Sequence, residues 1–170
     1  MRLVAGESRM KTLYVLRHGK AVPEAEAKSD HERKLTPRGQ ADVRRTAEHL
    51  RQRPTLPALV LASSARRARQ TAELCVSALP GSQLVIVDEL YLAEPASYLA
   101  ALAERAEPQG AAMVVGHNPG LEALIYVLCE RSEHLATASL VEIELKVASW
   151  SELSGRGRPA AGRVIDVFRC

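Results

Sequence analysis

Four short, continuous apolar runs, separated by amphipathic helical patterns, constrain the fold of this chain more than any other feature. The runs are Thr12–Leu16, Ala58–Ala62, Leu84–Val87 and Ala111–Val115. Strands that are apolar at consecutive positions are typically buried on both faces, as the strands of a parallel sheet are. The alternation of strand and helix patterns therefore predicts a three-layer α/β/α sandwich whose parallel strands are joined by right-handed crossovers.

Four helical stripes accompany these runs. The first follows Thr36-Pro37 and the last follows Asn118-Pro119, and each pair suits the N-cap and first position of a helix. The two middle stripes consist of Ala68, Ala72, Cys75 and Leu79, and of Leu99, Leu102, Ala103 and Ala106.

The C-terminal part has a different pattern. Residues 140–147 alternate between apolar and polar, which predicts a half-exposed antiparallel strand, and Arg163–Phe168 is its expected partner. The stretch between them, residues 151–162, is rich in Gly, Ser and Arg and is expected to be a mobile connection. We therefore expect a mostly parallel sheet with an antiparallel C-terminal strand pair.

The composition is that of a globular protein, with 170 residues of which 46% are hydrophobic and 25% charged. We expect one domain over residues 10–170, with residues 1–9 a disordered tail or the result of a start placed at Met1 instead of Met10. Few aromatic residues (4%) and a net charge of +3 argue against a nucleic-acid partner. No apolar run is long enough for a membrane span, and no secretory signal opens the chain, so a cytoplasmic location is expected.

Charged and polar side chains follow each apolar run. They are Arg17-His18-Gly19, then Ser63-Ser64 with Arg66-Arg67, then Asp88-Glu89, and finally Gly116-His117-Asn118. Ligands of parallel α/β sheets bind beyond the carboxyl ends of the strands, so these groups are expected to gather at one edge. Arginine forks and helix N-termini favour an oxyanion there, and above all a phosphoryl group.

Two histidines in such a site indicate covalent phosphoryl transfer. One neutral imidazole can attack phosphorus while the other, held cationic, stabilises the equatorial oxygens. Gly19 lacks a Cβ and allows close approach of a ligand or of backbone. The other histidines, His31, His49 and His134, follow no strand and are expected to have surface or structural roles. The sequence holds no HxH or HExxH pattern, so no metal site is expected.

These motifs resemble those of the histidine phosphatase (phosphoglycerate mutase-like) superfamily, whose RHG signature stands here as Arg17-His18-Gly19. More narrowly, the chain resembles the SixA-type phosphohistidine phosphatases. The matching stretches are RHGKA (Arg17–Ala21), SDHERKLTPRG (Ser29–Gly39), SSARRARQTAE (Ser63–Glu73) and VVGHNPG (Val114–Gly120).

The resemblance implies that His18 attacks the phosphoryl group and that water then hydrolyses the phosphohistidine intermediate. It implies that Arg17, Arg67 and His117 complete the phosphate pocket, with Arg67 rather than Arg66 or Arg69 as the second arginine. It also implies that no metal or other cofactor is needed. The candidate substrate-binding residues are Gly19, Asp30, Arg33 and Asn118.

The general acid is less well defined. Larger members of the superfamily use a glutamate to protonate the leaving alcohol, and Glu89 is the candidate here, with Asp30 as second choice.

A phosphohistidine needs less help from an acid, and a chain this short has little material for a lid. The expected substrate is therefore a phosphohistidine-containing protein. The alternatives are a small-molecule phosphatase or mutase of the same superfamily, and a phosphate-binding module without turnover.

Overall fold

The structure, a computed structural model, describes residues 10–155 and 162–170; the expected tail at residues 1–9 lies outside them. The strands are β1 (Lys11–Arg17), β2 (Leu59–Ser63), β3 (Gln83–Val87), β4 (Ala111–Gly116), β5 (Leu140–Leu145) and β6 (Gly162–Phe168). The helices are α1 (Pro37–Arg51), α2 (Arg66–Ser77), α3 (Pro95–Arg105) and α4 (Gly120–Cys129), with short 3-10 helices η1 (Glu24–Glu26), η2 (Asp88–Leu90) and η3 (Trp150–Ser154). None of the helices in the described ranges is both long and apolar enough to cross a bilayer.

The strands form one six-stranded sheet in the order β3-β2-β4-β1-β5-β6. The pairs β1–β4, β2–β4 and β2–β3 are parallel, whereas β5 runs antiparallel to β1 and β6 antiparallel to β5. The predicted fold class, a mostly parallel sheet with an antiparallel C-terminal pair, is confirmed.

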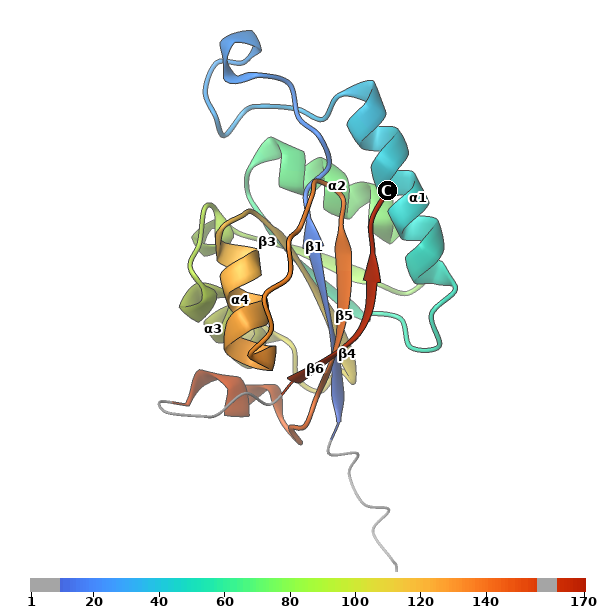
Figure 1. The fold of residues 1–170 in the computed structure, drawn as a ribbon, viewed down its shortest axis with the longest axis vertical. Coiled ribbons are helices and arrows are strands. Elements are labelled where there is room, and N and C mark those ends of the chain that lie inside the picture. Colours follow the sequence, from blue (N-terminus) through green and yellow to red (C-terminus); the bar gives the residue numbers. More distant parts are fainter. Residues whose placement is uncertain (1–9, 156–161) are drawn as a thin grey trace, which may run out of the picture.

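Helices cover both faces of the sheet, with α1 and α2 on one side and α3 and α4 on the other (Figure 1). Alternate residues of β1 pack against the two helix layers. Tyr14 and Leu16 pack in the core under α1 and α2, and Leu13 and Val15 pack in the core under α3 and α4. A strand that is buried on both faces must be apolar throughout, which explains the continuous runs in the sequence.

Two strands differ from their predicted exposure. β5 is not half exposed, because the Glu142 carboxylate accepts a hydrogen bond from Arg53 Nε at 2.7 Å and is covered by it. Alternation of polar and apolar residues cannot reveal that an arginine from a distant segment shields the polar face. β3 is not buried on both faces, because it is an edge strand paired with β2 alone, and Ile86 remains 38% exposed.

Two local predictions also need correction, while a third is confirmed. Thr36 caps α1 by accepting the Gly39 N–H at 2.9 Å, as expected. Asn118 does not cap α4, since its amide donates to Glu122 Oε1 and to the Leu135 carbonyl. The connection at residues 151–162 is in part ordered, because η3 begins with a capping box and buries Trp150; residues 156–161 lie outside the described ranges.

Candidate active site

The carboxyl ends of β1 and β4 bring two histidines together. Arg17 at the end of β1 is in register with Gly116 at the end of β4, and the His18 N–H donates to the Gly116 carbonyl at 3.2 Å. The residues that follow, His18 and His117, therefore lie side by side, with ring centroids 5.2 Å apart.

His18 presents a free nitrogen lone pair. Its Nδ1 lies 2.7 Å from the Gly19 carbonyl, and a carbonyl can only accept, so the hydrogen of the neutral ring is on Nδ1 and the lone pair on Nε2. Burial is the main reason that the pKa of His18 is lowered to about 4. The hydrogen bond to Gly19 raises this pKa, whereas the charges of Arg67 and Arg17 lower it further. The ring is therefore neutral near pH 7, as a nucleophile must be.

Gly19 orients this histidine by packing against α1. Its N–H donates to Thr71 Oγ1 at 3.0 Å, and a Cβ at this position would lie 2.7 Å from Val43 Cγ2 and 2.8 Å from the Gly39 carbonyl. The close approach expected at Gly19 is thus to the helix layer of the protein itself.

Arg67 is buried at the start of α2 and binds Asp30, whereas Arg66 and Arg69 are exposed. Its Nη1 donates to the Asp30 carbonyl at 2.7 Å and its Nη2 to Asp30 Oδ2 at 3.1 Å. Arg33 Nη1 donates to Asp30 Oδ1 at 3.0 Å. The two arginines and Asp30 thus form one connected cluster.

Tyr91 completes this cluster from η2, because its hydroxyl donates to Asp30 Oδ2 at 2.6 Å. The hydrogen bond from Tyr91, followed by those from Arg33 and Arg67, holds the pKa of Asp30 well below its usual range. Asp30 is therefore ionised and can only accept hydrogen bonds, so it has no proton to give to a leaving group.

His117 is neutral, not cationic as predicted. Burial lowers its pKa to about 3, and the neighbouring His18 and Arg67 lower it further, while Asp30 opposes them only in part. Its Nε2 lies 2.7 Å from Ser63 Oγ at the end of β2, and its backbone N–H donates to the Tyr98 hydroxyl at 3.3 Å. The prediction was wrong because strand-end placement does not show how completely a side chain is desolvated.

Around the two histidines, three buried nitrogen atoms have no hydrogen-bond partner among the residues that the structure describes: Arg17 Nε, Arg67 Nε and His117 Nδ1. Arg17 is itself held by a bond from Nη1 to the Leu135 carbonyl at 2.7 Å. A buried polar group left unpaired costs about 1–3 kcal/mol. An oxyanion bound among these side chains would accept their hydrogens, so the arrangement suits a phosphoryl group.

The remaining predicted site residues lie farther out. Glu89 is exposed on η2 and makes no hydrogen bond or ion pair within the described ranges. The amide nitrogen of Asn118 donates to Glu122 and to the Leu135 carbonyl, and its Oδ1 is buried with no partner in the described part of the chain. In residues 10–155 and 162–170, no group of three or more His, Cys, Asp or Glu side chains is arranged to hold a metal ion.

The sequence analysis placed Ser63 at a strand end without giving it a role, and it did not place Tyr91 or His31 at this site. The Tyr91 ring lies edge-on to His117 at 5.8 Å and to His31 at 4.9 Å, and His31 Nε2 lies 3.0 Å from Ser64 Oγ. The available signals were their positions, since Ser63 ends β2, Tyr91 follows η2 after β3, and His31 is next to Asp30. His49 and His134 lie elsewhere, paired with Asp166 and Glu122.

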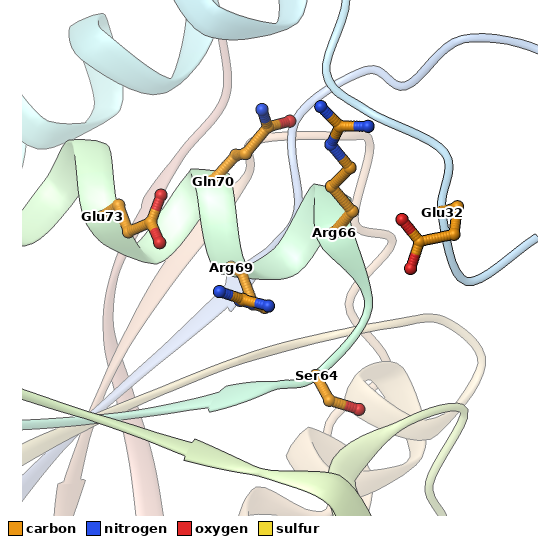
Figure 2. A pocket seen from close by; sticks show the side chains of 6 residues that line it. All are labelled: Glu32, Ser64, Arg66, Arg69, Gln70 and Glu73. Atoms are coloured by element: carbon orange, nitrogen blue, oxygen red, sulfur yellow. The ribbon is translucent and has the colours of Figure 1, made fainter. Parts of the chain in front are cut away.

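An open hollow adjoins the cluster. It is lined by Glu32, Ser64, Arg66, Arg69, Gln70 and Glu73. Figure 2 shows that most of these side chains extend from α2, while Glu32 projects toward them from the facing loop. Ser64 connects the hollow with the site, because it follows Ser63 and bonds to His31.

Comparison with known proteins places this constellation in a family. The model of the histidine phosphatase superfamily (branch 1) matches residues 13–91. An uncharacterized protein of a Picosynechococcus species is 33% identical over 111 residues, which cover 64% of this chain and 67% of that protein.

Two solved structures share the whole fold. A protein assigned as the phosphohistidine phosphatase SixA of Nakamurella multipartitia is 26% identical, with a TM-score of 0.79 over 94% of this chain and 96% of that one. The corresponding protein of Agrobacterium tumefaciens is 29% identical, with a TM-score of 0.76 over 94% and 98% of the two chains. With the RHG motif after β1 and the second histidine after β4, this chain belongs to the histidine phosphatase superfamily.

Proposed function

We propose that this protein is a phosphohistidine phosphatase that forms a covalent intermediate on His18. The observation that carries the proposal is the set of three unpartnered nitrogens, Arg17 Nε, Arg67 Nε and His117 Nδ1, beside a neutral imidazole. These donors would hold the phosphoryl oxygens while His18 Nε2 attacks phosphorus. No metal is required in this scheme, because the arginines stabilise the charge of the transition state.

Two displacements make up the proposed reaction. The Nε2 lone pair of His18 forms a bond to phosphorus as the bond from phosphorus to the substrate imidazole breaks. A water molecule then breaks the bond between His18 and phosphorus, which yields inorganic phosphate and restores the neutral ring.

The state of the carboxyl groups supports phosphohistidine over an ester as the substrate. A protonated imidazole leaves with its own proton, whereas an alkoxide needs a general acid, which typically contributes about 10²–10⁴-fold. Asp30 is held ionised by Tyr91 and the arginines, so it does not meet that need. Glu89 stays the candidate acid for esters, and Glu89→Gln should slow ester hydrolysis more than phosphohistidine hydrolysis.

The open hollow beside the site supports a protein substrate. It is bordered by side chains of α2 and of the loop that carries Glu32 (Figure 2), and Ser64 in its lining bonds to His31. Its lining is polar and charged, which suits the surface of a folded protein. We therefore expect a phosphohistidine-containing protein rather than a free metabolite as substrate.

A side-by-side assay tests the proposal. Phosphohistidine proteins and a series of phosphate esters are compared for release of inorganic phosphate, with rapid quench to trap a phosphoenzyme stable to alkali and labile to acid. The expected result is preference for phosphohistidine and loss of several orders of magnitude in His18→Ala. Preferred ester turnover or phosphoryl transfer to an acceptor would instead indicate an ester phosphatase or a mutase. Orthovanadate binding without any labelling of His18 would indicate a binding module.

A further inference from the structure

We propose that Ser63 is a positioning residue that holds His117 as the neutral tautomer with its hydrogen on Nδ1. In that tautomer His117 donates a hydrogen bond to a phosphoryl oxygen without becoming a cation. The inference rests on the phosphoryl pocket proposed above, but the tautomer itself exists with or without substrate.

The hydrogen bonds of Ser63 determine the direction of its bond to His117. The hydroxyl is fully buried, and Ser63 Oγ accepts the Ala65 N–H at 3.3 Å. Its own hydrogen has one bonding partner within the described ranges, His117 Nε2 at 2.7 Å. If Ser63 accepted from Nε2 instead, that hydroxyl hydrogen would be buried without an acceptor, which is costly. The satisfied arrangement therefore has Ser63 donating to a bare Nε2.

The other ring nitrogen follows from this direction. A neutral imidazole carries one hydrogen, so a bare Nε2 places it on Nδ1. Nδ1 of His117 is buried and has no hydrogen-bond partner in the described part of the chain. The burial that lowers the pKa of His117 keeps the ring neutral. The ring thus keeps an unused donor inside the pocket, next to His18.

The two imidazoles then carry their hydrogen on the same nitrogen but are prepared for opposite roles. The Gly19 carbonyl accepts from Nδ1 of His18 and leaves Nε2 free to attack. The Ser63 hydroxyl donates to Nε2 of His117 and leaves the Nδ1 hydrogen free to bind oxygen. Nucleophile and donor are therefore distinguished by one carbonyl and one hydroxyl.

The first test needs no variant. Long-range proton–nitrogen spectra of isotopically labelled protein, recorded near neutral pH without substrate, distinguish the two neutral tautomers and the cation. We expect His117 to carry its hydrogen on Nδ1 alone. A ring protonated on Nε2, or a cationic ring, would overturn the inference whatever the substrate proves to be.

Variants give a second readout. In Ser63→Ala the His117 signals should shift toward a mixture of tautomers, and kcat/KM and orthovanadate affinity should each fall about tenfold, the value of one buried hydrogen bond. Ser63→Thr, which keeps the hydroxyl, should restore both. Ser82→Ala is the matched control, because it also removes a serine hydroxyl that donates a hydrogen bond. That bond goes to the Pro57 carbonyl, and Ser82 lies just before β3, at the opposite end of the strands from the site. Unchanged tautomer and affinity in a folded Ser63→Ala would contradict the proposal.

Discussion

At the scale of single residues, the site depends on two histidines that burial keeps neutral. Solvent exclusion is the largest cause of the lowered pKa at both His18 and His117, and the surrounding arginines act in the same direction. A cationic His117 would add a further positive charge beside Arg17 and Arg67. A bound phosphoryl group would offset the charge of the arginines but not the burial, which is the largest cause of the lowered pKa.

Titration of the ring signals checks these values. We expect midpoints at about pH 4 for His18 and about pH 3 for His117, both below the ordinary value near 6.5. Between the native pKa values and 6.5, these histidines bind more protons in the unfolded chain than in the native one. Their contribution to the free energy of unfolding should therefore fall as pH drops below about 6.5 and level off below the native pKa values. Denaturant titrations of the wild type and of His117→Gln across this range provide the check, with a smaller fall expected in the variant. Midpoints near 6.5 would contradict the prediction.

At the scale of elements, the ends of strands and the starts of helices position the side chains of the site. β1 and β4 end in register, so the residues directly after them, His18 and His117, become neighbours. Gly116 at the end of β4 allows α3 to approach, because a Cβ there would lie 2.0 Å from the Tyr98 hydroxyl. The same hydroxyl accepts the backbone N–H of His117, so this helix contact also supports the site.

Substitution of Gly116 should therefore damage both stability and activity. Gly116→Ala displaces Tyr98 from a packed core, and we expect a loss of about 1–3 kcal/mol in the free energy of unfolding together with weaker orthovanadate binding. Gly110→Ala is the control, since nothing lies within 4 Å of a Cβ at that position. Urea denaturation and orthovanadate titration measure the two effects. Equal stability of the two variants would show that Tyr98 moves aside without cost.

At the scale of the whole molecule, the site residues come together at the carboxyl ends of the strands of a single sheet. β1, β2 and β4 are adjacent in the sheet although they lie far apart in the sequence, and the loop of Asp30 and the turn of Tyr91 close over their ends. In the proposed function, the cationic groups gathered there would supply the charge that a metal ion supplies in metal-dependent phosphatases.

Activity should accordingly survive exhaustive chelation and be inhibited by orthovanadate, which mimics the pentacoordinate transition state. Phosphate release is measured after dialysis against EDTA, with and without added Mg²⁺ or Zn²⁺. We expect equal rates in all three conditions, and inhibition by orthovanadate that weakens strongly in Arg67→Ala because its donors are lost. A rate that falls in EDTA and returns with added metal would revive a metal-dependent mechanism.

Local patterns in the chain were enough to predict the parallel core, the antiparallel C-terminal pair and the residues that follow β1, β2 and β4. These features depend on periodicity and on residue order along the chain, which the sequence shows directly. The burial of Glu142 depends on Arg53 and the engagement of Asp30 on Tyr91, and the proposed tautomer of His117 depends on Ser63. In each case the partner comes from a distant segment. Desolvation and hydrogen-bond direction are set by such neighbours, so only the tertiary structure decided which groups are charged and which nitrogen carries a hydrogen.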